Sequence, residues 1–235
     1  MSKLHLSFIH RRARRERGQS MVEMALAFPI LLLVLAGTLE VGMYFNVQLT
    51  LLDATREAAR YAADGDINLI DATNAGNCDE DYYYQAACLL RQNLYGVTFN
   101  ETTDDIIVST FTIDSTGHVR YRFPFPCSDP YYPGPGYPQL CDSNVETRNQ
   151  GWSLQKHRLG GAGAYSYFTN DAIENLLPDN MPPGAGLVVV EIYHLHHQFL
   201  GLIPPGMPFL PQEVMMHAYT MMPVPSAAPP PEYVP

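Results

Sequence analysis

The chain opens with its longest hydrophobic run, and the length of that run is that of a membrane helix. Residues 24–39 contain no charged side chain, and beyond Glu40 a further uncharged segment reaches Phe45. Together they supply the roughly 20 apolar residues that a helix needs to cross a bilayer. Residues 46–63 contain no glycine or proline and are rich in alanine, so we expect the helix to continue through them. The sequence predicts a transmembrane helix over 19–63 whose second half leaves the membrane as a stalk.

After residue 63 the hydrophobic pattern changes to the alternation and β-branched runs of strands. Residues 104–123 form two such runs around a turn, which predicts a hairpin. Residues 186–197 and 213–223 predict two further strands. Short helices are expected over residues 82–94 and 170–177, the second capped by Asn170 or Asp171.

Proline marks the irregular parts of the chain. The loop FPFPCSDPYYPGPGYPQLC is too rich in proline for regular structure, and the end of the chain, residues 223–235, is expected to be unstructured for the same reason. We therefore expect an α+β fold: the long helix, then a small α+β head with an antiparallel sheet over residues 64–222.

Charge is distributed unevenly along the chain. The leader, residues 1–18, contains six of the 14 basic residues and one acid, although the whole chain has a net charge of −10. Basic residues beside an apolar helix keep that end in the cytoplasm, and this position favours a topology signal over a nucleic-acid site. The charge pattern predicts a single-pass membrane protein with its N-terminus in the cytoplasm, its head outside and no nucleic-acid partner.

All four cysteines follow the predicted membrane helix, in the compartment where disulfides persist. Four cysteines allow three pairings. Proximity in the sequence favours Cys78 with Cys88 and Cys127 with Cys141. Their spacings do not match those of structural zinc sites.

Three histidines, His194, His196 and His197, introduce the alternative of a metal-dependent exported enzyme. His194 and His196 share one face of a predicted strand, and His217 lies in the next predicted strand. Three histidines can bind zinc. However, the sequence contains no H-E-x-x-H, no G-x-S-x-G and no glycine-rich phosphate loop. We therefore expect no metal, no cofactor and no enzymatic activity, and the exported enzyme is the less favoured alternative.

A short motif lies where the leader meets the apolar helix. Gly18 is followed by Gln19, and Glu23 is the fifth residue after the glycine. This arrangement resembles the prepilin-peptidase signal of type IV pilins and pseudopilins, in which cleavage follows the glycine. Cleavage here would create a new α-amine at Gln19, and the amine of a neighbouring subunit would pair with Glu23, which otherwise costs free energy inside a membrane. The alternative is an acid at the membrane border that faces water or lipid headgroups.

The resemblance extends along the whole predicted helix. The segment RGQSMVEMALAFPILLLVLAGTLEVGMYFNVQLTLLDATREAARYAADG is similar to the N-terminal region of TadE-like proteins, the pseudopilin-like components of tight-adherence (Flp-type) pilus systems. The matching positions are Arg17, Gly18, Gln19, Val22, Glu23, Pro29, Glu40, Arg56, Glu57, Ala58, Ala59, Arg60, Tyr61 and Ala62. The rest of the chain resembles the family only in having a V-x-x-x-Y strand followed by a final strand. Its cysteines and proline–tyrosine loop depart from the family's pattern.

The resemblance implies a pseudopilin or minor pilus component, anchored in the bacterial cytoplasmic (inner) membrane, that takes part in pilus assembly for adhesion or secretion. Its implied partners are a prepilin peptidase, other pilins and pseudopilins, the membrane platform of pilus assembly and membrane lipid. The positions implied in assembly or helix contacts are Glu23, Pro29, Glu40, Arg56 and Arg60. Glu40 has two readings, an acid that reaches water at the outer interface or a helix–helix contact inside the assembly. The alternative function is a membrane-tethered extracytoplasmic binding module that is not processed as a pilin.

Overall fold

The structure, a computed structural model, describes residues 9–65, 78, 82–114, 116–126, 141–142, 150–177, 185–201 and 212–224. It consists of two compact units. The first, here called the anchor unit, comprises residues 1–45 and 198–212; the second, the head, comprises residues 46–197 and 213–235.

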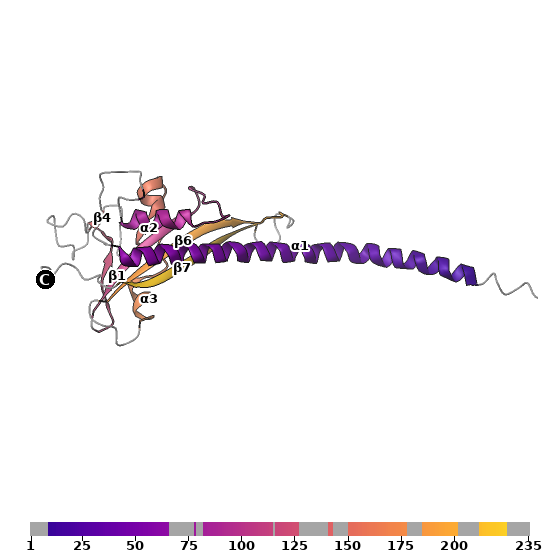
Figure 1. The fold of residues 1–235 in the computed structure, drawn as a ribbon, viewed down its shortest axis with the longest axis horizontal. Coiled ribbons are helices and arrows are strands. Elements are labelled where there is room, and N and C mark those ends of the chain that lie inside the picture. Colours follow the sequence, from indigo (N-terminus) through magenta and orange to yellow (C-terminus); the bar gives the residue numbers. More distant parts are fainter. Residues whose placement is uncertain are drawn as a thin grey trace, which may run out of the picture. The chain divides into compact units, whose positions relative to one another are not determined.

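The helix α1 (Ile9–Asp64) is one continuous element and passes through Pro29 (Figure 1). It confirms the predicted long N-terminal helix and begins earlier, inside the basic leader. In the anchor unit its apolar side chains are exposed; Leu33, for example, is 74% exposed. In the head one face of the helix is buried, because alanine side chains at helical spacing let it approach the sheet closely. The buried residues of this face are Leu51, Ala54, Thr55, Ala58, Ala59 and Ala62. The predicted stalk therefore contributes to the core of the head.

The head contains the predicted antiparallel sheet, and its strand order is β2-β1-β6-β7. The predicted hairpin is β1 (Asp105–Ile113) with β2 (Val119–Phe123), and the two later strands are β6 (Gly186–His197) and β7 (Glu213–Val224). A short strand that was not predicted, β5 (Trp152–Ser153), pairs with the first half of β1.

Two short helices lie where they were predicted, α2 (Tyr82–Gln92) and α3 (Asn170–Glu174). The prediction that Asn170 or Asp171 caps α3 is wrong, because Thr169 is the N-cap residue. Thr169 is extended and its hydroxyl accepts the N–H of Ala172 at 3.2 Å. A π-helical turn, Gln155–Leu159, was not predicted.

The proline–tyrosine loop contains some regular structure at its ends, contrary to expectation. Two-residue strands, β3 (Phe125–Pro126) and β4 (Cys141–Asp142), pair in parallel. The disulfide between Cys78 and Cys88 is present, with a Cα–Cα distance of 5.8 Å. Cys127 and most of the proline-rich tail lie outside the described residues, so the second predicted disulfide remains a prediction.

The two faces of the sheet are covered by different segments. On the helix face, α1 and α2 pack on the strands: the hydroxyls of Thr55 and Thr220 lie 3.0 Å apart, and Tyr82 donates to the carbonyl of Ala62 at 3.0 Å. On the opposite, loop face, residues 150–177 cover the strands. The core of the loop face is formed by Phe111, Phe168, Ile173 and Val189.

Candidate functional site

Gln19 and Glu23, two residues of the predicted processing motif, lie on one exposed side of α1. The side-chain amide of Gln19 donates to the carboxylate of Glu23 at 3.2 Å, one helical turn away. Both side chains are exposed, and the apolar residues that follow are exposed as well. Glu23 therefore stands at the head of an apolar surface, with a local partner that is neutral.

Glu40, the second acid of the apolar helix, has partners within the chain. Its Oε1 accepts the backbone N–H of Phe199 at 2.7 Å and its Oε2 accepts that of Leu200 at 3.0 Å. All three residues belong to the anchor unit. This arrangement was not among the two readings that the sequence suggested for Glu40.

The two basic positions of the REAARYAA segment are exposed on α1. Arg56 pairs with Asp53, one turn earlier, at 3.0 Å. This pair is solvent-exposed on both sides, so it contributes at most about 1 kcal/mol. Arg60 is exposed too, on the face of α1 opposite the buried alanines.

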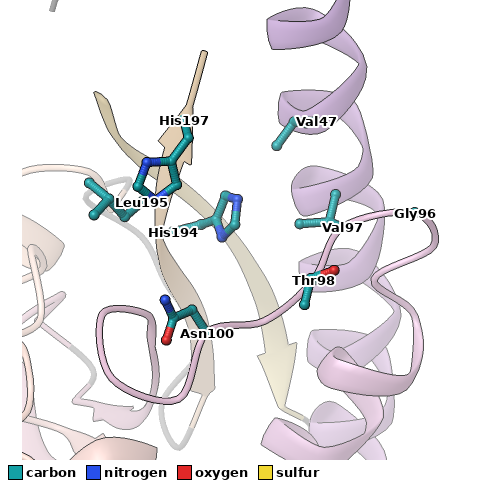
Figure 2. Close-up of a pocket in the computed structure, with 8 residues that line it drawn as sticks. All are labelled: Val47, Gly96, Val97, Thr98, Asn100, His194, Leu195 and His197. Carbon is teal, nitrogen blue, oxygen red and sulfur yellow. The ribbon is translucent and has the colours of Figure 1, made fainter. Parts of the chain in front are cut away.

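The described part of the head contains a pocket of about 320 Å³ in which residues of β6, the segment 96–100 and α1 meet. Figure 2 shows the ring of His194 extending from β6 toward α1, with Val47 on the helix and His197 nearer the end of the strand.

His194 is oriented by a buried carboxylate. Its Nδ1 lies 2.7 Å from Oδ2 of Asp104, which also accepts the backbone N–H of Asn100, while Oδ1 accepts that of Leu195. Burial alone would raise the pKa of Asp104, but these hydrogen bonds outweigh it and hold the pKa below its usual value. Asp104 is therefore ionised at neutral pH, and Nδ1 of His194 donates the proton.

An oriented Asp–His pair is chemically capable of proton transfer, which requires a reacting group within hydrogen-bond reach. In the described part of the chain no hydroxyl or thiol makes a hydrogen bond with His194. The pair instead joins the turn before β1 to the end of β6, so its geometry accounts for a structural role.

His217 lies on the other face of the sheet. It pairs in register with Tyr193, and its Nε2 lies 3.0 Å from Oε1 of Glu191. His194 is on the helix face, so the two histidines cannot ligate one metal ion. Within the described ranges, no group of three histidine, cysteine or acidic side chains is close enough to hold a metal.

Glu191 is the centre of a buried polar network on the loop face. Besides His217, it accepts the hydroxyl of Ser166 and the backbone N–H of Tyr167, the latter at 3.0 Å. These bonds attach the covering segment 150–177 to β6. The network thus compensates the burial of a carboxylate that is 0% exposed.

Two more buried charges attach the same segment to β1 and β2. Arg122 donates to the carbonyl of Phe168 at 2.8 Å and to Ser109 Oγ at 2.9 Å, and burial lowers its pKa to about 10. Asp105 accepts the hydroxyl of Ser153 and the N–H of Ala164. Burial raises the pKa of Asp105 in spite of these bonds.

None of these buried ionisable residues was predicted from the sequence. A signal existed for Glu191, because it is a lone acid within the run VVVEIY, where every neighbour is apolar. An acid in such a run is buried with a partner or faces solvent. Asp104 and Asp105 carry no comparable signal, since their partners lie up to 91 residues away.

The fold and the exposed apolar segment define a class of protein. The helix from Gln19 to Asp64 is long and apolar enough to cross a membrane, and no part of its most apolar window is buried in the structure. In the part of the chain that the structure describes it is the one helix with these properties, and this arrangement fits a single-pass membrane protein with an α+β head.

The family comparison is more specific. Residues 18–60 match the family model described as TadE-like protein, which confirms the resemblance over that segment. Neither a curated protein nor a solved structure matches the chain. The match and the apolar helix together support a membrane protein associated with the tight-adherence pilus.

Proposed function

We propose that the protein is a pseudopilin-like component of a tight-adherence pilus system, cleaved after Gly18 and assembled through Glu23. The observation that carries this proposal is the pairing of Gln19 with Glu23 at the head of an exposed apolar helix, inside the segment that matches the TadE-like family. No feature of the site requires that the protein catalyse a reaction.

The physical argument concerns the free energy of a carboxylate in the membrane. An acid at the centre of a membrane helix costs about 3 kcal/mol, and less near its border. The Gln19 amide is a neutral partner and offsets only part of this cost. Cleavage after Gly18 adds a positive α-amine at Gln19, and the amine of a neighbouring subunit would give Glu23 an ionic partner. Glu23 would then favour one register between subunits.

In the same proposal, the arginine-rich leader stays in the cytoplasm and is removed there by a prepilin peptidase. The head lies outside the cytoplasm, where the Cys78–Cys88 disulfide persists. Partners follow from this arrangement: other pilins and pseudopilins along the helix, and the membrane platform that assembles them. Arg56 and Arg60, exposed on α1, are available for such contacts.

The test is the intact mass and N-terminal sequence of the protein from native membranes, in cells with and without their prepilin peptidase. We expect Gln19 as the N-terminus only where the peptidase is present. If Met1 or Ser2 is found in both strains, the protein is instead an unprocessed, membrane-tethered binding module.

A second experiment separates processing from assembly. Glu23→Ala removes the carboxylate, and Glu57→Ala removes an exposed acid further along the same helix as a matched control. We expect Glu23→Ala to abolish crosslinking to other pilins in membranes while Glu57→Ala leaves it unchanged. Equal crosslinking in both variants would contradict the role of Glu23.

A further inference from the structure

The connection between β6 and β7 begins with residues bound to the apolar part of α1. Both oxygens of the Glu40 carboxylate accept a backbone N–H from it, one from Phe199 and one from Leu200. These residues belong to the same compact unit as residues 1–45. The two hydrogen bonds therefore hold Phe199 and Leu200, at the start of the connection, beside Glu40 of α1.

The level of Glu40 along α1 is near the outer border of the bilayer. From Met24, the first residue of the uncharged run, to Glu40 the helix rises roughly 24 Å at 1.5 Å per residue. The hydrocarbon core of a bilayer is roughly 30 Å thick. Glu40 therefore lies about one helical turn below the outer border, and Tyr44 and Phe45 follow at the border itself. Phe199 and Leu200 lie at the level of the carboxylate they bind.

The composition of the connection suits this level. The sequence FLGLIPPGMPFL, from Phe199 onward, contains no charged residue. Phe199 is 67% exposed, and so it presents an aromatic ring beside a helix whose own Phe45 is 58% exposed. Aromatic side chains are enriched at the border between hydrocarbon and headgroups. An exposed pair of large aromatic side chains such as Phe199 and Phe45 is less favourable in water than in lipid.

We propose that Phe199 and Leu200, at the start of the β6–β7 connection, form a second membrane-contacting element that lies in the outer interfacial region of the bilayer and is tethered to α1 by Glu40. In this tether the Glu40 carboxylate supplies the acceptors and the backbone N–H groups of Phe199 and Leu200 supply the donors. Backbone N–H groups and carboxylates are both costly in a lipid environment unless they are hydrogen-bonded. The inference rests on the membrane insertion of α1 but not on cleavage after Gly18.

The test measures the depth of residue 199 in the bilayer. The full chain is reconstituted into phosphatidylcholine vesicles that contain phosphatidylcholine brominated at a shallow or a deep chain position, and tryptophan quenching is recorded. Phe199→Trp places the probe, and Trp152, the only native tryptophan, gives the background. Leu32→Trp, in the apolar helix, is the control for lipid contact. Tyr165→Trp, at an exposed tyrosine of the head, is the control for water.

We expect quenching in Phe199→Trp to be at least about twofold stronger with shallow than with deep bromines, as for an interfacial aromatic ring. Leu32→Trp should show the reverse order, and Tyr165→Trp should not exceed background. Adding Glu40→Ala to Phe199→Trp should lower the quenching about twofold, because the tether is lost, whereas adding Glu57→Ala should not.

Three results would overturn the inference. If Phe199→Trp is not quenched while Leu32→Trp is, the connection does not contact lipid. If Glu40→Ala leaves the quenching of Phe199→Trp unchanged, the carboxylate is not the tether. If neither probe is quenched, α1 does not enter the bilayer, and the membrane premise of the proposed function fails with it. Failure of cleavage after Gly18, in contrast, changes none of these readings.

Discussion

Replacing Tyr82 with phenylalanine should destabilise the protein at neutral pH and stabilise it at alkaline pH. The phenol of Tyr82 is 3% exposed, donates to the carbonyl of Ala62 at 3.0 Å and lies 3.4 Å from the hydroxyl of Thr110. The carbonyl belongs to the last turn of α1, where it also accepts the backbone N–H of Gly65 at 3.2 Å. Burial raises the pKa of Tyr82 from 10.0 to about 12, although the hydrogen bond with Thr110 acts in the opposite direction.

The magnitude follows from the difference in pKa between the folded and unfolded states. Because the folded-state pKa is raised, the contribution of the neutral Tyr82 phenol to the free energy of unfolding is fully present below pH 10. It is lost as the pH rises to about 12. Each unit corresponds to 1.36 kcal/mol, so the loss is about 2–3 kcal/mol. At pH 7 the variant lacks one hydrogen bond, which costs about 1 kcal/mol. Wild type should therefore be about 1 kcal/mol more stable at pH 7 and less stable than Tyr82→Phe near pH 12.

The assay is urea unfolding of the full chain in detergent micelles from pH 7 to 12, followed by the fluorescence of Trp152, which is buried in the head. Thr110→Val is the control, because it removes the weaker contact and keeps the phenol. It should lose stability at alkaline pH as wild type does. A difference between wild type and Tyr82→Phe that stays constant across this range would refute the reasoning.

Two further predictions concern the head. Asp104→Asn should weaken the loss of stability that acid causes. Because the folded-state pKa of Asp104 is lowered, its carboxylate stabilises the fold above the unfolded-state pKa of 3.8, and this stability is lost as the pH falls through the folded-state pKa. Urea unfolding between neutral pH and the acid limit measures this, and equal acid limbs in both proteins would contradict it. Thr169→Ala should lower the free energy of unfolding by about 1 kcal/mol through loss of the α3 cap, and Thr169→Ser should restore most of it. An equal loss in Thr169→Ser would show that the hydroxyl is not responsible.

The elements that the sequence predicted well are those with a strong local signal. The run GLVVVEIYHLHH has the bounds of β6 because it is short, apolar and rich in β-branched residues, and the uncharged run after Glu23 marks α1 by its length. The cap of α3 was misplaced by one residue, since Thr169, Asn170 and Asp171 are all good caps and only the backbone conformation decides among them.

Contacts between distant parts of the chain were beyond sequence reasoning. The sequence grouped His194 and His217 as ligands of one possible metal, because both lie in strands that were expected to be neighbours. The strands are indeed neighbours, but the register places His217 opposite Tyr193, and successive residues of a strand point to opposite faces. Because His217 lies opposite Tyr193 and not opposite His194, the two histidines point to opposite faces of the sheet. Each pairs with an acid, Asp104 or Glu191, that no local pattern connects to it.

The two acids of the apolar segment differ in how the chain satisfies them, and this difference bears on assembly. Glu40 accepts two backbone N–H groups from its own chain, so its burial in an interface is already compensated. Glu23 accepts only the neutral amide of Gln19 among the described residues, on a helix surface that is otherwise apolar and exposed. A carboxylate with a weak local partner gains more from a partner subunit than one with two donors. It follows that substitution of Glu23 should disturb contacts between subunits, whereas substitution of Glu40 should disturb the position of the β6–β7 connection within one subunit.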